Sequence, residues 1–265
     1  MTPEQFLATH GLFTRGDLQA VLRDRGSLSP ETVTSHLVRW KRLGRIVQVK
    51  QGLYVRRNEG GEVMPVIDLL ALASRMAPDA VLAYHTALEA HGHAQSLFEK
   101  LTFATWTKTK PVRFLGRRIV PVRPRGSLAR AGRSGGWTES VDRAGMEVKV
   151  TTLERTLVDI FDRPDLSGGL DEVWRSCASI PALDLRELEG YLLLLDRPTV
   201  TARVGFFLEH RTDDLAVSSG LLDRLRQRSP RTKAYMDRRR RSRLAAGWNL
   251  MVPEGLLIAE REEVR

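Results

Sequence analysis

The stretch SHLVRWKRLGRIVQVKQGLYVRR, residues 35–57, decides the fold of the first part of the chain. It holds the end of a helical pattern, which stops at Gly44, and then two β-rich runs, Ile46–Val49 and Leu53–Val55. Lys50-Gln51-Gly52 separates the two runs, and so short a connection with a glycine is typical of a β-hairpin. The stretch therefore predicts a helix that is followed directly by a hairpin.

The helix that enters this stretch begins at Ser29-Pro30-Glu31, which supplies a cap, a proline at the first helical position and an acid in the first turn. Val33, Leu37 and Trp40 are spaced i, i+4 and i+7, so they form one buried stripe. The core face of this helix is therefore defined by three residues.

Two shorter helices are expected upstream. Pro3 and Glu4 open a helix that ends near Thr9, and Thr14 caps a second helix that Gly26 ends. The second helix places Leu18, Val21 and Leu22 on one face. Three helices and a hairpin within about 55 residues predict a winged helix-turn-helix over residues 1–58.

The outward face of the third helix is expected to read DNA. Arg39 can form a bidentate pair with guanine in the major groove, and Thr32, Ser35 and His36 lie nearer the start of the helix, close to base edges. Basic residues on and after the helix are expected to contact DNA phosphates. Such contacts position a protein on DNA but do not read its sequence. The expected DNA-binding residues are Thr32, Ser35, His36, Arg39, Arg42, Arg45, Lys50, Gln51, Arg56 and Arg57. The alternative is a winged helix that contacts only protein.

Composition supports a polyanionic partner. The chain has 265 residues and a net charge of +10, and the excess of cations lies in the first 150 residues. Between Glu99 and Glu139 there are ten basic residues and no acidic residue, and such a field attracts nucleic acid. We expect auxiliary contacts to DNA or to a partner from Lys108, Lys110, Arg113, Arg117, Arg118, Arg123 and Arg125.

The cell compartment is expected to be the cytoplasm. No apolar run of about 18 residues marks a membrane span, and the first residues lack the pattern of a signal peptide. Cys177 is the single cysteine, so no intramolecular disulfide can form, as is usual in a reducing compartment. We read this cysteine as a packing residue rather than a nucleophile.

The rest of the chain predicts an α+β domain, residues 62–265, with a helical second half. Glu59-Gly60-Gly61 is the expected linker. Helical patterns cover residues 66–73 and 80–90, and strand patterns cover 100–106, 112–123 and 146–150. Further helices are expected at 152–162, 169–179, 184–195, 199–210 and 218–227, and short strands at 233–236 and 248–252.

Four segments resemble a known family. AVLAYHTALEAHG (80–92), TTLERTLVDIFDRPDLSGGLDEVW (151–174) and RVGFFLEHR (203–211), which follow QGLYV (51–55), are similar to the AbiEi antitoxins of type IV toxin–antitoxin systems, known from phage abortive infection. The resemblance implies an autorepressor that binds repeats in its own promoter. It also implies an antidote to a cognate AbiEii-type nucleotidyltransferase toxin, with neutralisation in the C-terminal domain.

The residue patterns of the same segments are typical of structural helices and turns. We expect no catalytic site, metal or cofactor in them. Arg155 and Asp159 are spaced i, i+4 and can pair on one helix. Phe206 and Phe207 are expected to pack, and Gly168-Gly169 allows positive φ.

Two metal-dependent functions, a nuclease and a zinc site, have weaker support in the sequence than DNA binding. Glu147-Val148-Lys149, with an upstream acid such as Asp142, has the spacing of a PD-(D/E)xK nuclease, although E-x-K arises freely on an amphipathic strand. His85, His91 and His93 lack the spacing of a zinc site.

A third alternative makes the chain a one-component regulator whose C-terminal domain senses a small molecule. The run Arg238–Arg241, within ten basic residues between Arg224 and Arg243, is either a solvated face or a surface that supports DNA or meets an acidic partner.

Overall fold

A computed structural model describes residues 1–24, 30–58, 67–143 and 145–256. The fold is α+β, as the sequence predicts, and no helix in these ranges is long and apolar enough to cross a membrane. The expected cap at Ser29, the helix end at Gly26 and the linker at residues 59–61 lie outside the described residues.

The N-terminal unit contains the three helices and the hairpin expected from the sequence. Thr14 caps the second helix through a reciprocal capping box with Asp17. Val33, Leu37 and Trp40 are all buried, as their spacing predicts. The elements are α1 (Pro3–Thr9), β1 (Leu12–Thr14), α2 (Arg15–Arg23), α3 (Pro30–Arg42), β2 (Ile46–Lys50) and β3 (Leu53–Arg56).

Strand β1 was not predicted. It pairs antiparallel with β3, which makes a sheet of order β1-β3-β2. Phe13 on β1 lies between Trp40 and Tyr54, with ring centroids 6.3 and 5.7 Å away. The strand thereby joins the hairpin to the helices. It was not predicted because three residues are too few to show an alternating pattern in the sequence.

A six-stranded mixed sheet of order β6-β7-β5-β4-β9-β8 occupies the middle of the molecule. Strand β8 and helix α6 were not predicted, and the pattern at 112–123 resolves into two strands joined by a turn at Leu115-Gly116. The elements are α4 (Leu69–Ser74), β4 (Val81–Leu82), α5 (His85–His91), β5 (Lys100–Ala104), β6 (Val112–Phe114), β7 (Arg117–Val122), α6 (Gly126–Arg130), β8 (Thr138–Arg143) and β9 (Met146–Thr151).

The prediction of a single helix over residues 80–90 was wrong. Val81 and Leu82 form a central strand of the sheet, and Tyr84 then turns the chain into α5 with φ 59° and ψ −137°. A bulky residue rarely adopts this backbone conformation, which ends the strand abruptly. Sheet pairing prevailed here over a helical hydrophobic pattern.

All five helices that the sequence predicts in the second half of the chain are present in the structure. Phe161, Trp174 and Phe207 are fully buried at its centre, with ring centroids 5.4–6.3 Å apart. The elements are α7 (Leu153–Asp162), the 3-10 turn η1 (Pro164–Ser167), α8 (Leu170–Ala178), α9 (Leu185–Leu195), α10 (Pro198–Glu209), α11 (Ser219–Gln227), β10 (Ala234–Tyr235), β11 (Ser242–Ala245), the 3-10 turn η2 (Ala246–Trp248) and β12 (Leu250–Pro253).

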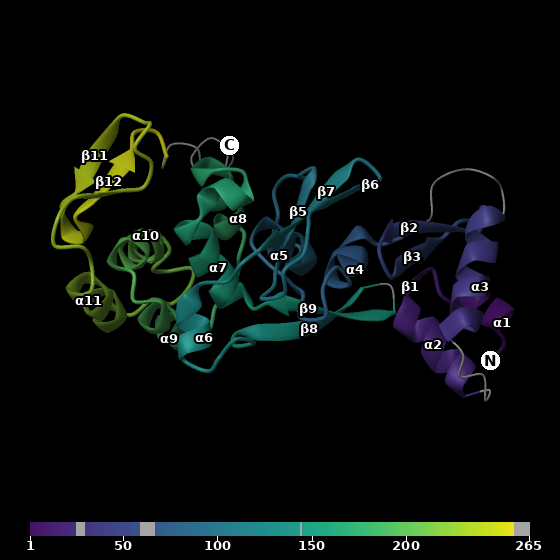
Figure 1. Cartoon of the computed structure of the whole chain (residues 1–265). Helices are drawn as coiled ribbons and strands as arrows, with labels where there is room; N and C mark the ends of the chain where they lie inside the picture. Colours follow the sequence, from purple (N-terminus) through teal and green to yellow (C-terminus); the bar gives the residue numbers. More distant parts are fainter. Residues whose placement is uncertain (25–29, 59–66, 144, 257–265) are drawn as a thin grey trace.

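The molecule is elongated, with the N-terminal unit at one end and α7–α11 with β10–β12 at the other (Figure 1). The N-terminal unit also packs on the sheet region. Leu12, Leu53 and Val55 belong to the same hydrophobic cluster as Leu70 and Phe103. Arg75 forms an ion pair with Asp17 at 3.5 Å, so apolar and polar contacts both join the two parts.

Candidate nucleic-acid interface

Helix α3 presents one buried and one exposed face. Ser35, Arg39 and Arg42 are exposed, and Thr32 and His36 are half-buried. The His36 ring leans on Trp40, with ring centroids 5.6 Å apart. The five residues expected on the outward face are therefore not buried in the core.

Sequence reasoning missed three more residues on the exposed side of α3. Val38 is 59% exposed, which is unusual for an apolar residue on a helix with an otherwise polar surface. Lys41 donates a 2.7 Å hydrogen bond from Nζ to Gln48 Oε1 and so ties α3 to β2. Thr34 accepts a 2.9 Å bond from Arg15 Nη2, which fixes α3 against α2. The i, i+3, i+4 spacing of Ser35, Val38 and Arg39 was visible in the sequence.

Two of the expected phosphate contacts instead hold the unit together. Arg45 Nη1 lies 2.5 Å from Glu4 Oε2, and this contact, with a bond from Trp40 Nε1, keeps the pKa of Glu4 below its usual value. Arg56 Nη1 donates to the carbonyl oxygen of Ala8, which caps α1. Their guanidiniums are thus committed to internal partners.

Arg57 lies next to these two arginines in a recess of about 660 Å³, and its buried Nε has no acceptor among the described residues. The three guanidiniums line one wall of the N-terminal unit with Leu7 and Ala8. The recess is lined by α1, by the end of β3 with Arg57 and Asn58, and by Leu43–Arg45, which directly follow α3.

Lys50 does not project from the hairpin. Its Nζ donates to the carbonyl oxygen of Met76, which follows α4, and burial lowers the pKa of Lys50. Gln51, at the turn of the hairpin, is exposed. The hairpin tip therefore offers a polar amide, while its lysine is used to join the N-terminal unit to the sheet region.

The acid-free segment is partly neutralised by the fold. Arg117 pairs with Glu89 at 3.0 Å and Arg125 with Asp162 at 2.5 Å. The Arg123 guanidinium lies 5.4 Å from the centre of the Trp106 ring. The exposed cations among the seven residues expected to make auxiliary contacts are Lys108, Lys110, Arg113, Arg118 and Arg123, and Arg130 and Arg133 of the same segment are exposed as well. Arg113 lies on β6 and Arg118 on β7, and β6 packs beside β2 of the N-terminal unit (Figure 1).

The nuclease-like residues do not assemble a metal site. Asp142 and Glu147 are cross-strand partners on β8 and β9, but Glu147 accepts a 2.6 Å bond from Ser140 Oγ. Glu147 and Lys149 point to the same exposed side, as their spacing predicts. Within the described ranges, no three His, Cys, Asp or Glu side chains gather closely enough to hold a metal ion.

The histidines are separated as well. His85 is buried against Phe98, with Nε2 3.5 Å from Glu172 Oε1, and burial lowers its pKa. His91 Nε2 instead lies 2.8 Å from the carbonyl oxygen of Thr151. These contacts serve the packing of α5 against the sheet and α8.

Comparison with known proteins identifies a similar fold. The sequence matches no family model and no curated protein to a significant degree. The structure is similar to the crystal structure of the Rv2827c protein from Mycobacterium tuberculosis, with a TM-score of 0.60 at 16% sequence identity. The match covers 99% of this chain and 93% of that chain. The likeness therefore extends over both the N-terminal unit and the rest of the molecule, and at this identity it establishes the fold alone.

Proposed function

We propose that the chain is a cytoplasmic, non-enzymatic repressor of the winged helix-turn-helix class that binds double-stranded promoter DNA through α3. The observation that carries the proposal is the exposed face of α3, where Ser35, Arg39 and Arg42 follow one another along the helix and neither arginine forms an ion pair within 4 Å with a carboxylate of the described residues. A helix of this width fits the major groove, and a guanidinium there reads guanine.

The surrounding charge supports the same assignment. Arg113 and Arg118 are exposed on the hairpin that packs beside β2, and we expect them to contact phosphates that flank the groove. These residues contribute affinity rather than sequence preference, because every duplex carries the same phosphates.

A binding titration tests this proposal. Fluorescence anisotropy compares a labelled duplex from upstream of the chain's own gene with a scrambled duplex of equal composition. The wild-type chain should prefer the promoter duplex. Arg39→Ala should reduce that preference, while Arg186→Ala, which removes an equally exposed arginine from α9, should leave it unchanged. Equal binding of both duplexes by the wild-type chain refutes promoter recognition.

The antitoxin role rests on the resemblance to AbiEi proteins. We assign neutralisation of a cognate AbiEii-type nucleotidyltransferase toxin to residues 62–265. The segments that carry the resemblance lie in α5, α7, η1, α8 and α10, which form the buried frame of that part. Growth of cells that express the toxin, with and without the chain, tests this role, and failure of the full chain to restore growth would refute it.

A second candidate is a one-component regulator that senses a small molecule. It is favoured by a polar cavity of about 840 Å³ in the second half of the chain, within the usual size range of ligand sites. The two candidates share the DNA-binding step, and a ligand that alters promoter affinity without any toxin would favour the sensor.

A further inference from the structure

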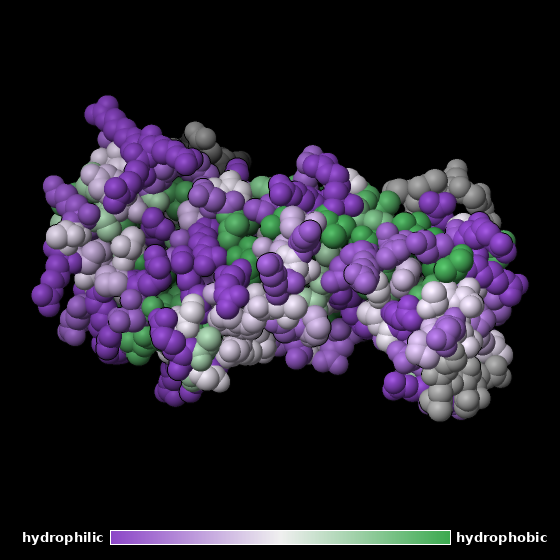
Figure 2. Space-filling view, in the orientation of Figure 1, coloured by the Kyte–Doolittle hydropathy of each residue, from purple (hydrophilic) through white to green (hydrophobic). Residues whose placement is uncertain are grey.

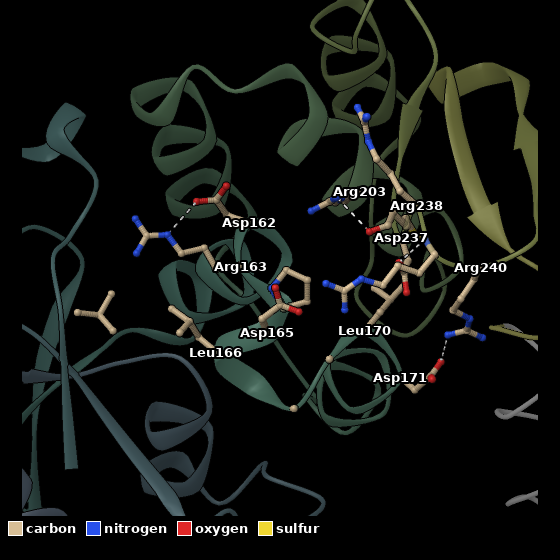
Figure 3. A pocket seen from close by; sticks show the side chains of 16 residues that line it. Asp162, Arg163, Asp165, Leu166, Leu170, Asp171, Arg203, Asp237, Arg238 and Arg240 are labelled. Atoms are coloured by element: carbon tan, nitrogen blue, oxygen red, sulfur yellow. Dashed lines mark hydrogen bonds and ion pairs between the residues drawn. The ribbon is translucent and has the colours of Figure 1, made fainter. Parts of the chain in front are cut away.

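The polar cavity lies between the start of α8 and the loop that follows β10 (Figure 3). One wall is η1 with Gly168 and Gly169, and the opposite wall is Met236–Arg240. Arg203, from α10, closes the back. Three segments that are distant in the sequence thus meet around one recess.

Most of the basic run Arg238–Arg241 lines this cavity. Arg238, Arg239 and Arg240 all line it, and only Arg241 of the run does not. The Arg238 guanidinium lies 5.5 Å from the centre of the Tyr235 ring, and Arg240 pairs with Asp171 at 2.7 Å. Hydrophilic side chains project over this end of the molecule in Figure 2. The run is therefore partly a cavity wall and not simply a solvated face.

Arg203 forms no ion pair within 4 Å with a carboxylate of the described residues, although the charges of Asp162 and Asp237 act on it from farther away. Its two terminal nitrogens donate to the carbonyl oxygens of Phe161, Tyr235 and Met236, at 2.8, 2.6 and 3.1 Å. Its Nε is buried and has no acceptor among the described residues. A guanidinium stays protonated at every physiological pH, so a positive charge with an unused donor is held at the back of the cavity.

The carboxylates nearby, Asp162 and Asp237, cancel this charge only in part. Asp162 is only 2% exposed and already lies within 4 Å of three arginines: Arg125 at 2.5 Å, Arg197 at 3.1 Å and Arg163 at 3.9 Å. Two of these, Arg125 and Arg197, lie outside the cavity lining, so they add positive charge behind it. Five arginines and four aspartates, Asp237 among them, line the recess, so its wall carries one more guanidinium than carboxylate, and Arg125 and Arg197 add to this charge from behind.

The start of α8 adds to the same field. Its cap, Gly169, has φ 94° and no side chain to satisfy the first amides of the helix. The partial positive charge of a helix N-terminus favours phosphate. The acids of the first turn are engaged elsewhere, since Asp171 pairs with Arg240 and Glu172 accepts a 3.0 Å bond from Ser176.

We propose that this cavity binds a phosphate-bearing small molecule of nucleotide size. Arg203, Arg238 and Arg239 would hold the phosphate groups, because guanidinium forks match phosphate oxygens. The volume of about 840 Å³ exceeds what a phosphate ion fills. Asp165, which has no partner among the described residues, offers an acceptor for a hydroxyl of the rest of the ligand.

Calorimetric titration of the full chain tests the site. ATP, pyrophosphate and inorganic phosphate are each titrated into the wild-type chain, Arg239→Glu and Arg241→Glu. The last is the matched control, because Arg241 belongs to the same run, is 87% exposed and lies outside the cavity. We expect Arg239→Glu to weaken ATP binding about tenfold or more and Arg241→Glu to change it by less than about twofold.

The three titrations also show whether the site recognises a nucleotide or only its phosphate groups. Tighter binding of ATP than of pyrophosphate would identify a nucleotide site, and equal binding would show that the phosphates alone are recognised. Only the first result supports a ligand of nucleotide size, and equal binding overturns that part of the proposal. Absence of saturable binding of ATP and pyrophosphate to the wild-type chain overturns it, as do equal losses in the two variants. Displacement of ATP by an oligonucleotide without terminal phosphates also overturns it, because the recess would then belong to a nucleic-acid surface.

Discussion

The ammonium of Lys50, in the hairpin, donates a hydrogen bond to the carbonyl oxygen of Met76, beyond α4. The contact is flanked by Leu53 and Val55, which share a hydrophobic cluster with Leu70. The hairpin is therefore fixed to the sheet region by a polar and an apolar contact. This arrangement sets the direction in which α3 faces relative to the rest of the molecule.

Lys50→Met should lower stability without changing how DNA binding responds to salt. The substitution keeps the aliphatic stem but removes the bond to Met76, so we expect a loss of about 1 kcal/mol in the free energy of unfolding. Urea denaturation measures that loss. Promoter binding at several salt concentrations should give the same slope as the wild-type chain, because the ammonium of Lys50 is held by the carbonyl oxygen of Met76.

Arg42→Ala is the matched comparison for Lys50. Arg42 is exposed at the end of α3, so its loss should leave urea denaturation unchanged and reduce the salt slope by about one unit. If Lys50→Met lowered the slope as Arg42→Ala does, Lys50 would contact phosphate, and the bond to Met76 would not persist in the complex.

Arg39→Ala should remove sequence preference at one base pair. The side chain is exposed in the middle of the face that we assign to the major groove, and loss of a bidentate contact with guanine costs about 1–3 kcal/mol. Anisotropy titrations with promoter duplexes changed one base pair at a time measure this effect. Unchanged preference at every position would contradict the orientation assigned to α3.

The sequence predicted the helices far better than the short strands. Val33, Leu37 and Trp40 have a helical period that only one packing satisfies, and α7–α11 show the same kind of pattern. Strands β1 and β4 have only two or three residues, so no alternation is visible. At residues 80–90 the helical pattern was misleading, because β4, which holds Val81 and Leu82, is paired with β5 on one edge and β9 on the other.

The candidate interface could be predicted only in part. The outward face of α3 follows from its buried stripe, since the two faces of a helix exclude each other. The partners of Lys50, Arg45 and Arg56 could not be foreseen, because Met76, Glu4 and Ala8 meet them only through the tertiary fold. The cavity around Arg203 joins segments from three parts of the chain, and no local pattern marks it.

Gly168→Ala should destabilise the second half strongly. Gly168 has φ +81°, and a Cβ there would lie 2.0 Å from Cζ of Phe98. Strain and overlap together should cost about 3 kcal/mol or more. Gly92→Ala is the control, because Gly92 has φ +80° but open space around it, so only the strain of about 1–2 kcal/mol applies. Thermal and urea denaturation measure both, and equal losses would show that Phe98 moves aside.

His85 should make the protein less stable in mild acid. Burial lowers its pKa in the folded chain below the ordinary value of 6.5, against the opposing effect of Glu172. As pH falls below 6.5, the unfolded chain takes up a proton that the folded chain does not, so the free energy of unfolding decreases. His85→Gln should flatten this decrease between pH 6.5 and about pH 5. Denaturant titrations across that range measure it, and an unchanged profile would assign the acid sensitivity to other groups.

Replacing both Arg39 and Arg42 by alanine in the full chain should separate repression from neutralisation. Both side chains are exposed on α3, so the fold should persist while promoter affinity falls by about 2–5 kcal/mol. This variant is a sharper test than deletion of residues 1–61, because deletion would expose the cluster that Leu12, Leu53 and Val55 share with Leu70. If residues 62–265 neutralise the toxin, cells that express both proteins from an unrelated promoter should grow as well with the variant as with the wild-type chain. Growth arrest with a folded variant would mean that neutralisation needs the DNA-binding face itself.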